Sequence, residues 1–80
     1  MKTFHLTIAR IGEKLFDAEA VSASVPGAEG MFEILGGHEP FISELRAGEV
    51  RVRTERGEER FAVPQGGIAE VSGSEATILL

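Results

Sequence analysis

Residues 21–30 read VSASVPGAEG, and this stretch decides the fold class. Val21, Ala23 and Val25 are apolar at alternate positions, with a serine between each pair. Strict alternation of this kind is typical of a β-strand with one buried face and one face in water. Residues 26–30 then bring a proline and two glycines, which is a turn signal. The stretch therefore predicts a short strand that ends in a tight turn.

The same alternation recurs along the chain. Phe4, Leu6 and Ile8 carry it at the start, and further strands are expected around residues 50–53, 61–63, 68–71 and 76–80. Turn signals rich in glycine and proline separate these segments at intervals of about 8–12 residues, the interval typical of β-sandwiches and barrels. We therefore predict an all-β fold with two stacked sheets of short strands, formed by a single domain over residues 1–80.

Residues 13–20 fit either secondary structure. Their composition permits a short helix, but Gly12 and Glu13 precede them as a hairpin turn would. We expect the segment to continue the first hairpin as a strand. A second hairpin tip is predicted at residues 55–58, where Gly57 supplies positive φ.

The composition limits what so small a domain can do. The chain has 80 residues, of which 42% are hydrophobic and 26% charged, as in ordinary globular proteins. A chain of this length has a thin core with little room for a deep catalytic pocket. The net charge of −5 disfavours a nucleic-acid module, and the absence of cysteine removes disulfides and thiolate metal sites. We expect a binding protein and not an enzyme.

Few residues suggest a reactive site. His5 and His38 are the two imidazoles, and a metal site would need both together with a carboxylate such as Glu33 or Glu39. No serine lies in a nucleophile elbow, and the paired glycines lack the spacing of a phosphate-binding loop. Lys14 lacks the neighbours of a lipoyl or biotinyl attachment site. We expect no catalytic residue, no metal and no cofactor.

The arginines of the second half are expected to form a solvated, salt-bridged surface. Arg51 and Arg53 alternate with valines in one predicted strand, and Glu55, Glu58 and Glu59 follow closely. A single-strand binder would also present exposed aromatic residues beside a positive groove. We therefore expect no nucleic-acid partner. No apolar run is long enough to span a membrane and no signal-peptide pattern is present, which favours the cytoplasm.

Several motifs together resemble a known family. Residues 25–30 (VPGAEG) lead into residues 34–41 (ILGGHEPF), and the motifs His38-x-Pro40, Gly48 and 66–68 (GGI) follow at fixed spacing. In this pattern the chain resembles the N-terminal β-sandwich of the epsilon subunit of the F-type ATP synthase, which is called delta in mitochondria. The resemblance covers essentially all 80 residues.

The resemblance implies a fold and a role. The fold would be a sandwich of two five-stranded sheets, about ten short strands. The role would be that of a non-catalytic rotor subunit of the central stalk, which links the gamma subunit to the c-ring and couples proton or sodium transport to ATP synthesis. It would act on the catalytic alpha/beta head only indirectly. It would lie on the cytoplasmic face of an energy-transducing membrane as a peripheral subunit, with no direct membrane insertion.

The resemblance also assigns candidate interface residues. It places His38, Pro40, Phe41 and Ser43 toward gamma, and Ala28, Glu29, Gly30 and Met31 toward the c-ring. Gly27, Gly48, Gly66 and Gly67 are expected at structural turns. In many relatives another acidic residue and a further glycine stand where this chain has Met31 and Glu33. Met31 would make the ring contact more apolar and adaptable.

Family members usually continue into a two-helix hairpin, and these 80 residues encode no C-terminal helical hairpin. We therefore expect coupling and assembly from this chain, without inhibition by helix insertion. The alternative function is a free-standing β-sandwich that binds a protein or a ligand. Co-purification with other synthase subunits distinguishes the two.

Overall fold

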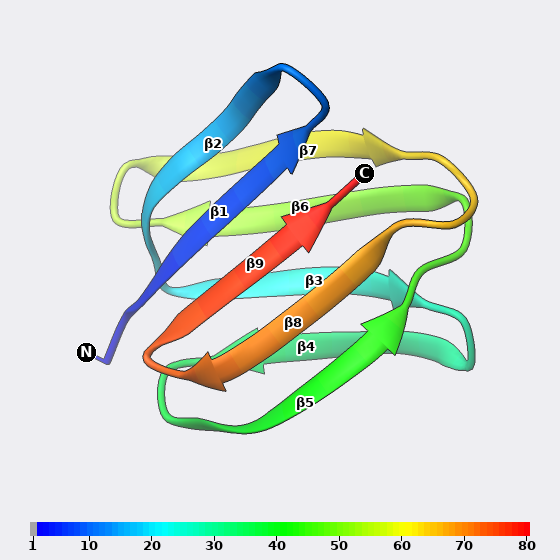
Figure 1. Ribbon diagram of the computed structural model, residues 1–80. Coiled ribbons are helices and arrows are strands. Elements are labelled where there is room, and N and C mark those ends of the chain that lie inside the picture. The colour runs from blue at the N-terminus through cyan, green and yellow to red at the C-terminus, as the bar shows by residue number, and fades with distance from the viewer. Residues whose placement is uncertain (1) are drawn as a thin grey trace.

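Two stacked β-sheets form the protein in a computed structural model that describes residues 2–80 (Figure 1). The five-stranded sheet has the order β2-β1-β9-β8-β5 and contains β1 (Phe4–Arg10), β2 (Glu13–Ala20), β5 (His38–Glu44), β8 (Ile68–Gly73) and β9 (Glu75–Leu79). The four-stranded sheet has the order β4-β3-β6-β7 and contains β3 (Ser22–Gly27), β4 (Gly30–Leu35), β6 (Gly48–Thr54) and β7 (Gly57–Val63). The described residues form no helix. The predicted all-β sandwich is therefore confirmed.

The strand count differs from the expectation of about ten, because the described residues form nine strands and the second sheet has four. Between β5 and β6 the chain crosses from one sheet to the other. There Leu45 makes only an isolated antiparallel bridge to Gly27. One bridge holds the crossover against β3 without adding a strand to its sheet.

The core lies between the sheets and follows from the alternation in the sequence. All neighbouring strands pair antiparallel except β1 and β9, which pair parallel. Burying one valine, leucine, isoleucine or phenylalanine side chain stabilises a fold by about 1.5–3 kcal/mol. The largest fully buried side chains are Phe4, Leu6, Ile8, Ile34, Leu45, Ile78, Val25, Val50, Val52 and Val71.

Residues 13–20 form β2, so the strand prediction for this segment is confirmed. The tertiary contacts explain the choice, because Phe16 and Ala20 lie opposite Ile8 and Phe4 of β1 and share their buried face. Gly12 has φ 77° in the turn before β2. Gly57 has φ 138° in the β6–β7 hairpin, as predicted.

An aromatic pair closes each side of the sandwich. On one side Phe16 of β2 meets Phe61 of β7 edge-on, with ring centroids 5.8 Å apart. On the other side Phe32 of β4 meets Phe41 of β5, with centroids 5.1 Å apart and planes at 75°. Edge-to-face packing suits the aromatic quadrupoles. Each pair joins the edge strand of one sheet to the edge strand of the other.

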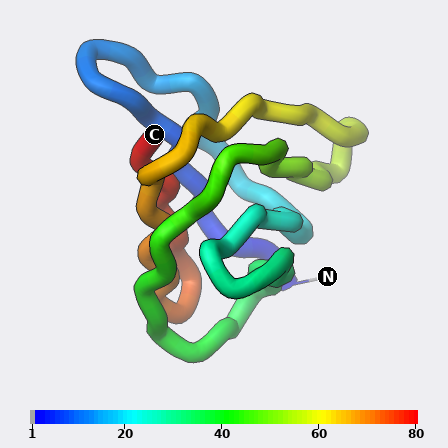
Figure 2. Tube along the Cα trace, turned by 90° about the vertical axis from the view of Figure 1, so that its right-hand side faces the viewer, coloured from blue at the N-terminus to red at the C-terminus, as the bar shows by residue number. Residues whose placement is uncertain are grey.

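The turns divide between the two ends of the sandwich. Figure 2 shows the two layers from the side, and Figure 1 shows the turns β1–β2, β3–β4, β5–β6 and β7–β8 at one end with the end of β9. The turns β2–β3, β4–β5, β6–β7 and β8–β9 lie at the other end. Because β4 runs from one end to the other, the turns before and after it point away from each other.

Candidate interaction surfaces

The residues predicted to face gamma lie on β5, the last strand of the five-stranded sheet. β5 pairs only with β8, and its register shifts between His38 and Phe41. The His38 ring packs on the Phe41 ring at a centroid distance of 5.1 Å, and its Nδ1 lies 3.0 Å from the Glu39 carbonyl oxygen. Pro40 is exposed, whereas His38, Phe41 and Ser43 are half-buried. The structure therefore brings these residues together along one edge.

The residues predicted to face the c-ring form the β3–β4 turn and the start of β4. Ala28 and Glu29 are exposed turn residues, and Gly30 follows them with φ 135°. Met31 is 55% exposed, which is high for so large an apolar side chain. The turn presents one carboxylate beside one flexible thioether.

The two predicted surfaces lie at different places on the sandwich, but both are connected to β5. His38 begins β5 at one end of the sandwich, and the β3–β4 turn lies at the other. The far end of β5 reaches that turn, because the Ala28 amide donates to the Glu44 carbonyl over 2.8 Å. The amide of Arg46 donates to the Pro26 carbonyl over 3.0 Å. A continuous hydrogen-bonded backbone thus links the two surfaces.

The four glycines assigned to turns occupy two kinds of position. Gly27 ends β3 and Gly48 begins β6, so both flank turns without forming them. A Cβ on Gly27 would lie 2.8 Å from the Gly30 carbonyl oxygen and 2.9 Å from the Phe32 ring. Gly66 has φ 97° in the β7–β8 turn, a conformation that favours glycine. Gly67 is buried, and a Cβ there would lie 2.9 Å from the Leu79 carbonyl oxygen.

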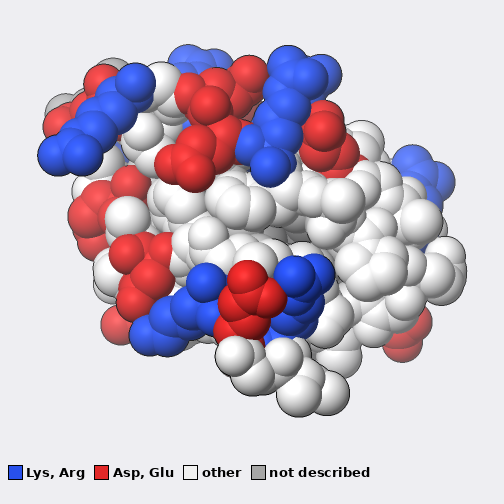
Figure 3. Space-filling model, turned by 90° about the horizontal axis from the view of Figure 1, so that it is seen from above, with Lys and Arg blue, Asp and Glu red and all other residues white. Residues whose placement is uncertain are grey.

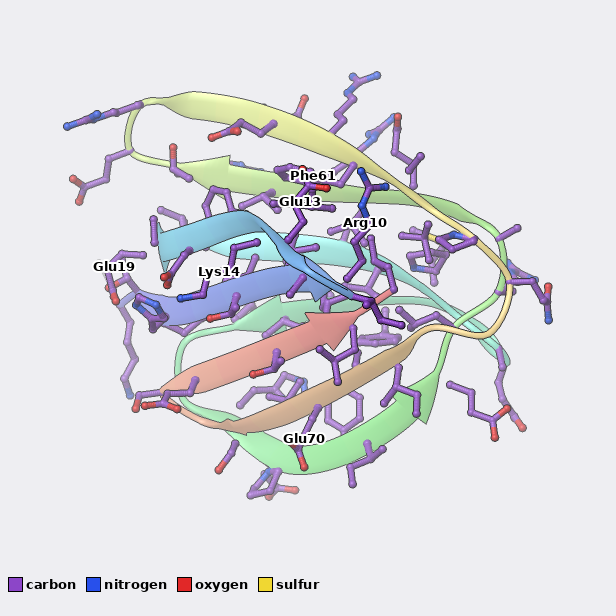
Figure 4. The ribbon with its side chains drawn as sticks, turned by 45° about the horizontal axis from the view of Figure 1, so that its top comes forward. Arg10, Glu13, Lys14, Glu19, Phe61 and Glu70 are labelled. Atoms are coloured by element: carbon purple, nitrogen blue, oxygen red, sulfur yellow. The ribbon has the colours of Figure 1, made fainter. Side chains whose placement is uncertain are left out.

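Charged side chains cover the side of the sandwich formed by β2 and β7, which lies opposite the β4–β5 side (Figure 3). Figure 3 shows two charged bands there, over the edges of both sheets, with an uncharged strip between them. Arg60 lies 3.5 Å from Glu58, and Arg51 lies 3.8 Å from Glu49. Arg10 and Glu13 lie together at the β1–β2 hairpin (Figure 4), with a 2.9 Å ion pair. Arg51 therefore has an ion pair, but with Glu49 and not with the expected glutamates. Among the described residues Arg53 has no ion pair.

His5 on the outer face of β1 stands between two carboxylates of β2. Its Nε2 lies 2.5 Å from Asp17 Oδ1 and its Nδ1 lies 3.2 Å from Glu19 Oε2. The hydrogen bonds to Asp17 and then to Glu19 raise the pKa of His5. The hydrogen bond to His5, followed by the one from Lys14, lowers the pKa of Asp17. The β1–β2 register brings this cluster together, because it pairs His5 with Glu19 and Thr7 with Asp17.

An open cleft lies between β2 and the β6–β7 hairpin. It has a volume of about 510 Å³ and is lined by Thr3, Phe16, Ala18, Glu19, Val21, Thr54, Glu55, Arg56 and Glu59. The sequence did not indicate it, because it forms where edges of the two sheets diverge. Its carboxylates are exposed to water, so it cannot desolvate a reacting group.

Two further observations concern metals and membranes. No group of three or more His, Asp or Glu side chains within residues 2–80 is arranged to hold a metal ion. In that same range no helix has the length and apolar character needed to cross a membrane.

Exposed apolar residues on the β4–β5 side were not singled out from the sequence. Leu35 of β4 is 48% exposed and Ile42 of β5 is 68% exposed. The alternation places Leu35 and Ile42 on outer faces, and only the strand order shows that both lie at a sheet edge. With Met31 they are three of the six exposed large hydrophobic residues in the part of the chain that the structure describes.

Comparisons with known proteins agree with one another. Residues 3–80 match the family model described as "ATP synthase, Delta/Epsilon chain, beta-sandwich domain". The chain is 40% identical over 79 residues to the ATP synthase epsilon chain of Alkalilimnicola ehrlichii, covering 99% of this chain and 56% of that protein. The chain therefore spans about half the length of this curated relative.

Solved structures share the fold. One is the cryo-EM structure of Euglena gracilis mitochondrial ATP synthase, OSCP/F1/c-ring, with a TM-score of 0.88 at 24% identity over 99% of this chain and 51% of that chain. Another is the central stalk and c-ring of the Tetrahymena thermophila mitochondrial ATP synthase, with a TM-score of 0.76 at 13% identity over 99% of this chain and 65% of that chain. At these identities the likeness shows the sandwich and its topology.

Proposed function

Because the chain belongs to the family of the ATP synthase delta/epsilon β-sandwich domain, we propose that it is a non-catalytic part of the central stalk. In this role it joins the gamma subunit to the c-ring and transmits rotation between them. The family match over residues 3–80 and the 40% identity to an epsilon chain support the assignment. The ion transported and the ATP made belong to the whole complex. The chain itself acts as a peripheral subunit at the membrane surface, on its cytoplasmic face.

The observation that carries the proposal is the connection between the two predicted surfaces. β5 holds the gamma-facing residues along its length, and its end is bonded to the β3–β4 turn through Ala28 and Glu44. The sandwich measures 32 × 24 × 19 Å, so it is short enough to contact a partner at each end. A load applied at the turn passes into β5 through backbone hydrogen bonds and not through a flexible linker.

The packing suits the transmission of torque. One buried cluster joins both sheets, and the Phe32–Phe41 pair packs β4 against β5. Close-packed interiors have low compressibility and transmit strain. The domain therefore acts as one rigid body between its partners.

The gamma surface is tested with substitutions that spare the core. Phe41 packs on Phe32, so the double variant His38→Asp and Pro40→Asp is preferable to any change at Phe41. We expect this variant to bind purified gamma at least about tenfold more weakly, because two carboxylates would be placed in an interface. Binding is measured by titration calorimetry, and folding by circular dichroism.

The matched control adds the same two charges to the far side. Ala18 and Ala62 are exposed on β2 and β7, so Ala18→Asp with Ala62→Asp should leave gamma affinity unchanged. Equal affinity of wild type and the His38/Pro40 variant would show that gamma does not use the β5 surface. Binding of another protein in place of synthase subunits would favour the free-standing interaction module.

A further inference from the structure

The four edge strands of the two sheets differ in how they are protected. An edge strand carries backbone N–H and C=O groups without a partner, and proteins guard such edges with charges, prolines and bulges. The edges in this sandwich are β2 and β5 in one sheet and β4 and β7 in the other. Three of them carry such protection among the described residues.

The guarded edges use different means. β2 carries the charged residues Glu13, Lys14, Asp17 and Glu19, and β7 carries Glu58, Glu59 and Arg60. β5 contains Pro40 and a register shift between His38 and Phe41. Each of these features hinders the addition of a regular strand.

β4 lacks this protection. It pairs with β3 in an unbroken register from Gly30 to Leu35, and it contains no proline and no bulge. Glu33 is its single charged residue. Met31 and Leu35, two residues to either side of Glu33, are 55% and 48% exposed. This edge combines an unbroken register with exposed apolar side chains, and such an edge is a template for strand pairing.

We propose that β4 accepts an extended strand of the gamma subunit, which adds a fifth strand to the four-stranded sheet. Main-chain hydrogen bonds would supply affinity and alternate side chains would supply specificity. The inference rests on the proposed function, because it assigns the strand to the subunit that β5 is proposed to contact. β4 lies directly behind that surface, since Phe32 packs on Phe41.

The charge on β4 defines the partner strand. Met31, Glu33 and Leu35 share the outer face, whereas Ile34 is buried in the core. Among the described residues Glu33 has no ion pair, and the arginine in its row, Arg51, lies 3.8 Å from Glu49. The complementary strand therefore carries a lysine or arginine opposite Glu33 and an apolar residue opposite Leu35.

A second copy of this chain fits the edge poorly. Antiparallel pairing of two β4 strands centred on Glu33 would set Met31 against Leu35 but Glu33 against Glu33. Like charges directly opposite one another destabilise a strand pair. Each copy also carries a net charge of −5. The lone glutamate thus disfavours self-pairing and favours a basic partner strand.

Hydrogen exchange of the domain, free and bound to gamma, tests the proposal. The β4 amides that do not bond to β3 should exchange at least about tenfold more slowly in the complex, because they gain a strand partner. Amides of the β7 edge should be unchanged. If the complex forms and β4 exchanges as in the free domain, strand addition is wrong. If no complex forms, the proposed function itself fails, and this inference fails with it.

A charge reversal tests the predicted basic residue. Glu33→Lys should weaken gamma binding by about tenfold, whereas Glu55→Lys at the β6–β7 hairpin should not. Equal effects of the two variants would overturn the charge assignment. Protection of β4 that rises with the concentration of the domain alone, without gamma, would overturn the proposal in favour of self-pairing.

Discussion

Two carboxylates, Asp17 and Glu19, flank His5 and favour its charged form, which raises its pKa. Both ring nitrogens face acceptors, Asp17 and Glu19, and only the doubly protonated ring can donate to both. We expect the His5 pKa, measured by NMR titration of its ring protons, to lie above the ordinary 6.5. Asp17→Asn should lower it, because His5 Nε2 would then donate to a neutral amide oxygen in place of a carboxylate. A pKa at or below 6.5 in the wild type would contradict the geometry.

The same cluster predicts how stability depends on pH. The raised pKa of His5 stabilises the fold below 6.5, and this contribution disappears as pH rises through the raised value. The lowered pKa of Asp17 stabilises the fold above 3.8, and this contribution disappears as pH falls through the lowered value. The difference in unfolding free energy between wild type and His5→Gln should therefore be largest between these limits. Urea denaturation across the range would show a flat difference if the cluster contributes nothing.

The structure leaves no space for a side chain at Gly27. A Cβ there would approach the Gly30 carbonyl and the Phe32 ring to within 3 Å, and both belong to the packed β3–β4 hairpin. We expect Gly27→Ala to lower the free energy of unfolding by about 1–3 kcal/mol. Gly48→Ala should cost less, because its Cβ would meet only the Pro26 ring, at 3.0 Å. Equal costs in urea denaturation would argue against the close approach at Gly27.

At the scale of elements, the aromatic pairs fasten edge strands across the two sheets. Phe32 and Phe41 meet edge-on at 5.1 Å and join β4 to β5. A double-mutant cycle with Phe32→Leu and Phe41→Leu should show a coupling of about 0.5–1.5 kcal/mol in unfolding free energy. Strictly additive losses would mean that the rings contribute only through burial.

The alternation of apolar and polar residues predicted the strands, but it did not predict which strands pair with one another. Val25, Val50 and Ile78 alternate with polar residues, so their strands and buried faces were readable from the sequence. Ser22 was expected to face water, yet it is only 8% exposed because β3 lies between β4 and β6. Which strands become edges depends on pairings between distant segments, such as β1 with β9. The apolar edge at β4 could therefore not be predicted from the sequence.

At the scale of the whole molecule, the motifs of the sequence predict the family, and the family match over residues 3–80 confirms it. The candidate interface residues are implied by the same resemblance, and the structure shows where a single domain presents them. The β5 surface and the β3–β4 turn lie apart but share a hydrogen-bonded frame. The sandwich topology that joins them could not be read from spacing alone, because the crossover at Leu45 is a tertiary feature.

As a component of the central stalk, this domain should bind gamma directly. The most direct test mixes the purified chain with purified gamma and follows co-elution by size-exclusion chromatography at physiological salt. We expect a stable stoichiometric complex that survives dilution. A domain that is folded by circular dichroism yet elutes apart from gamma would contradict the claim and mean that the sandwich serves a different partner.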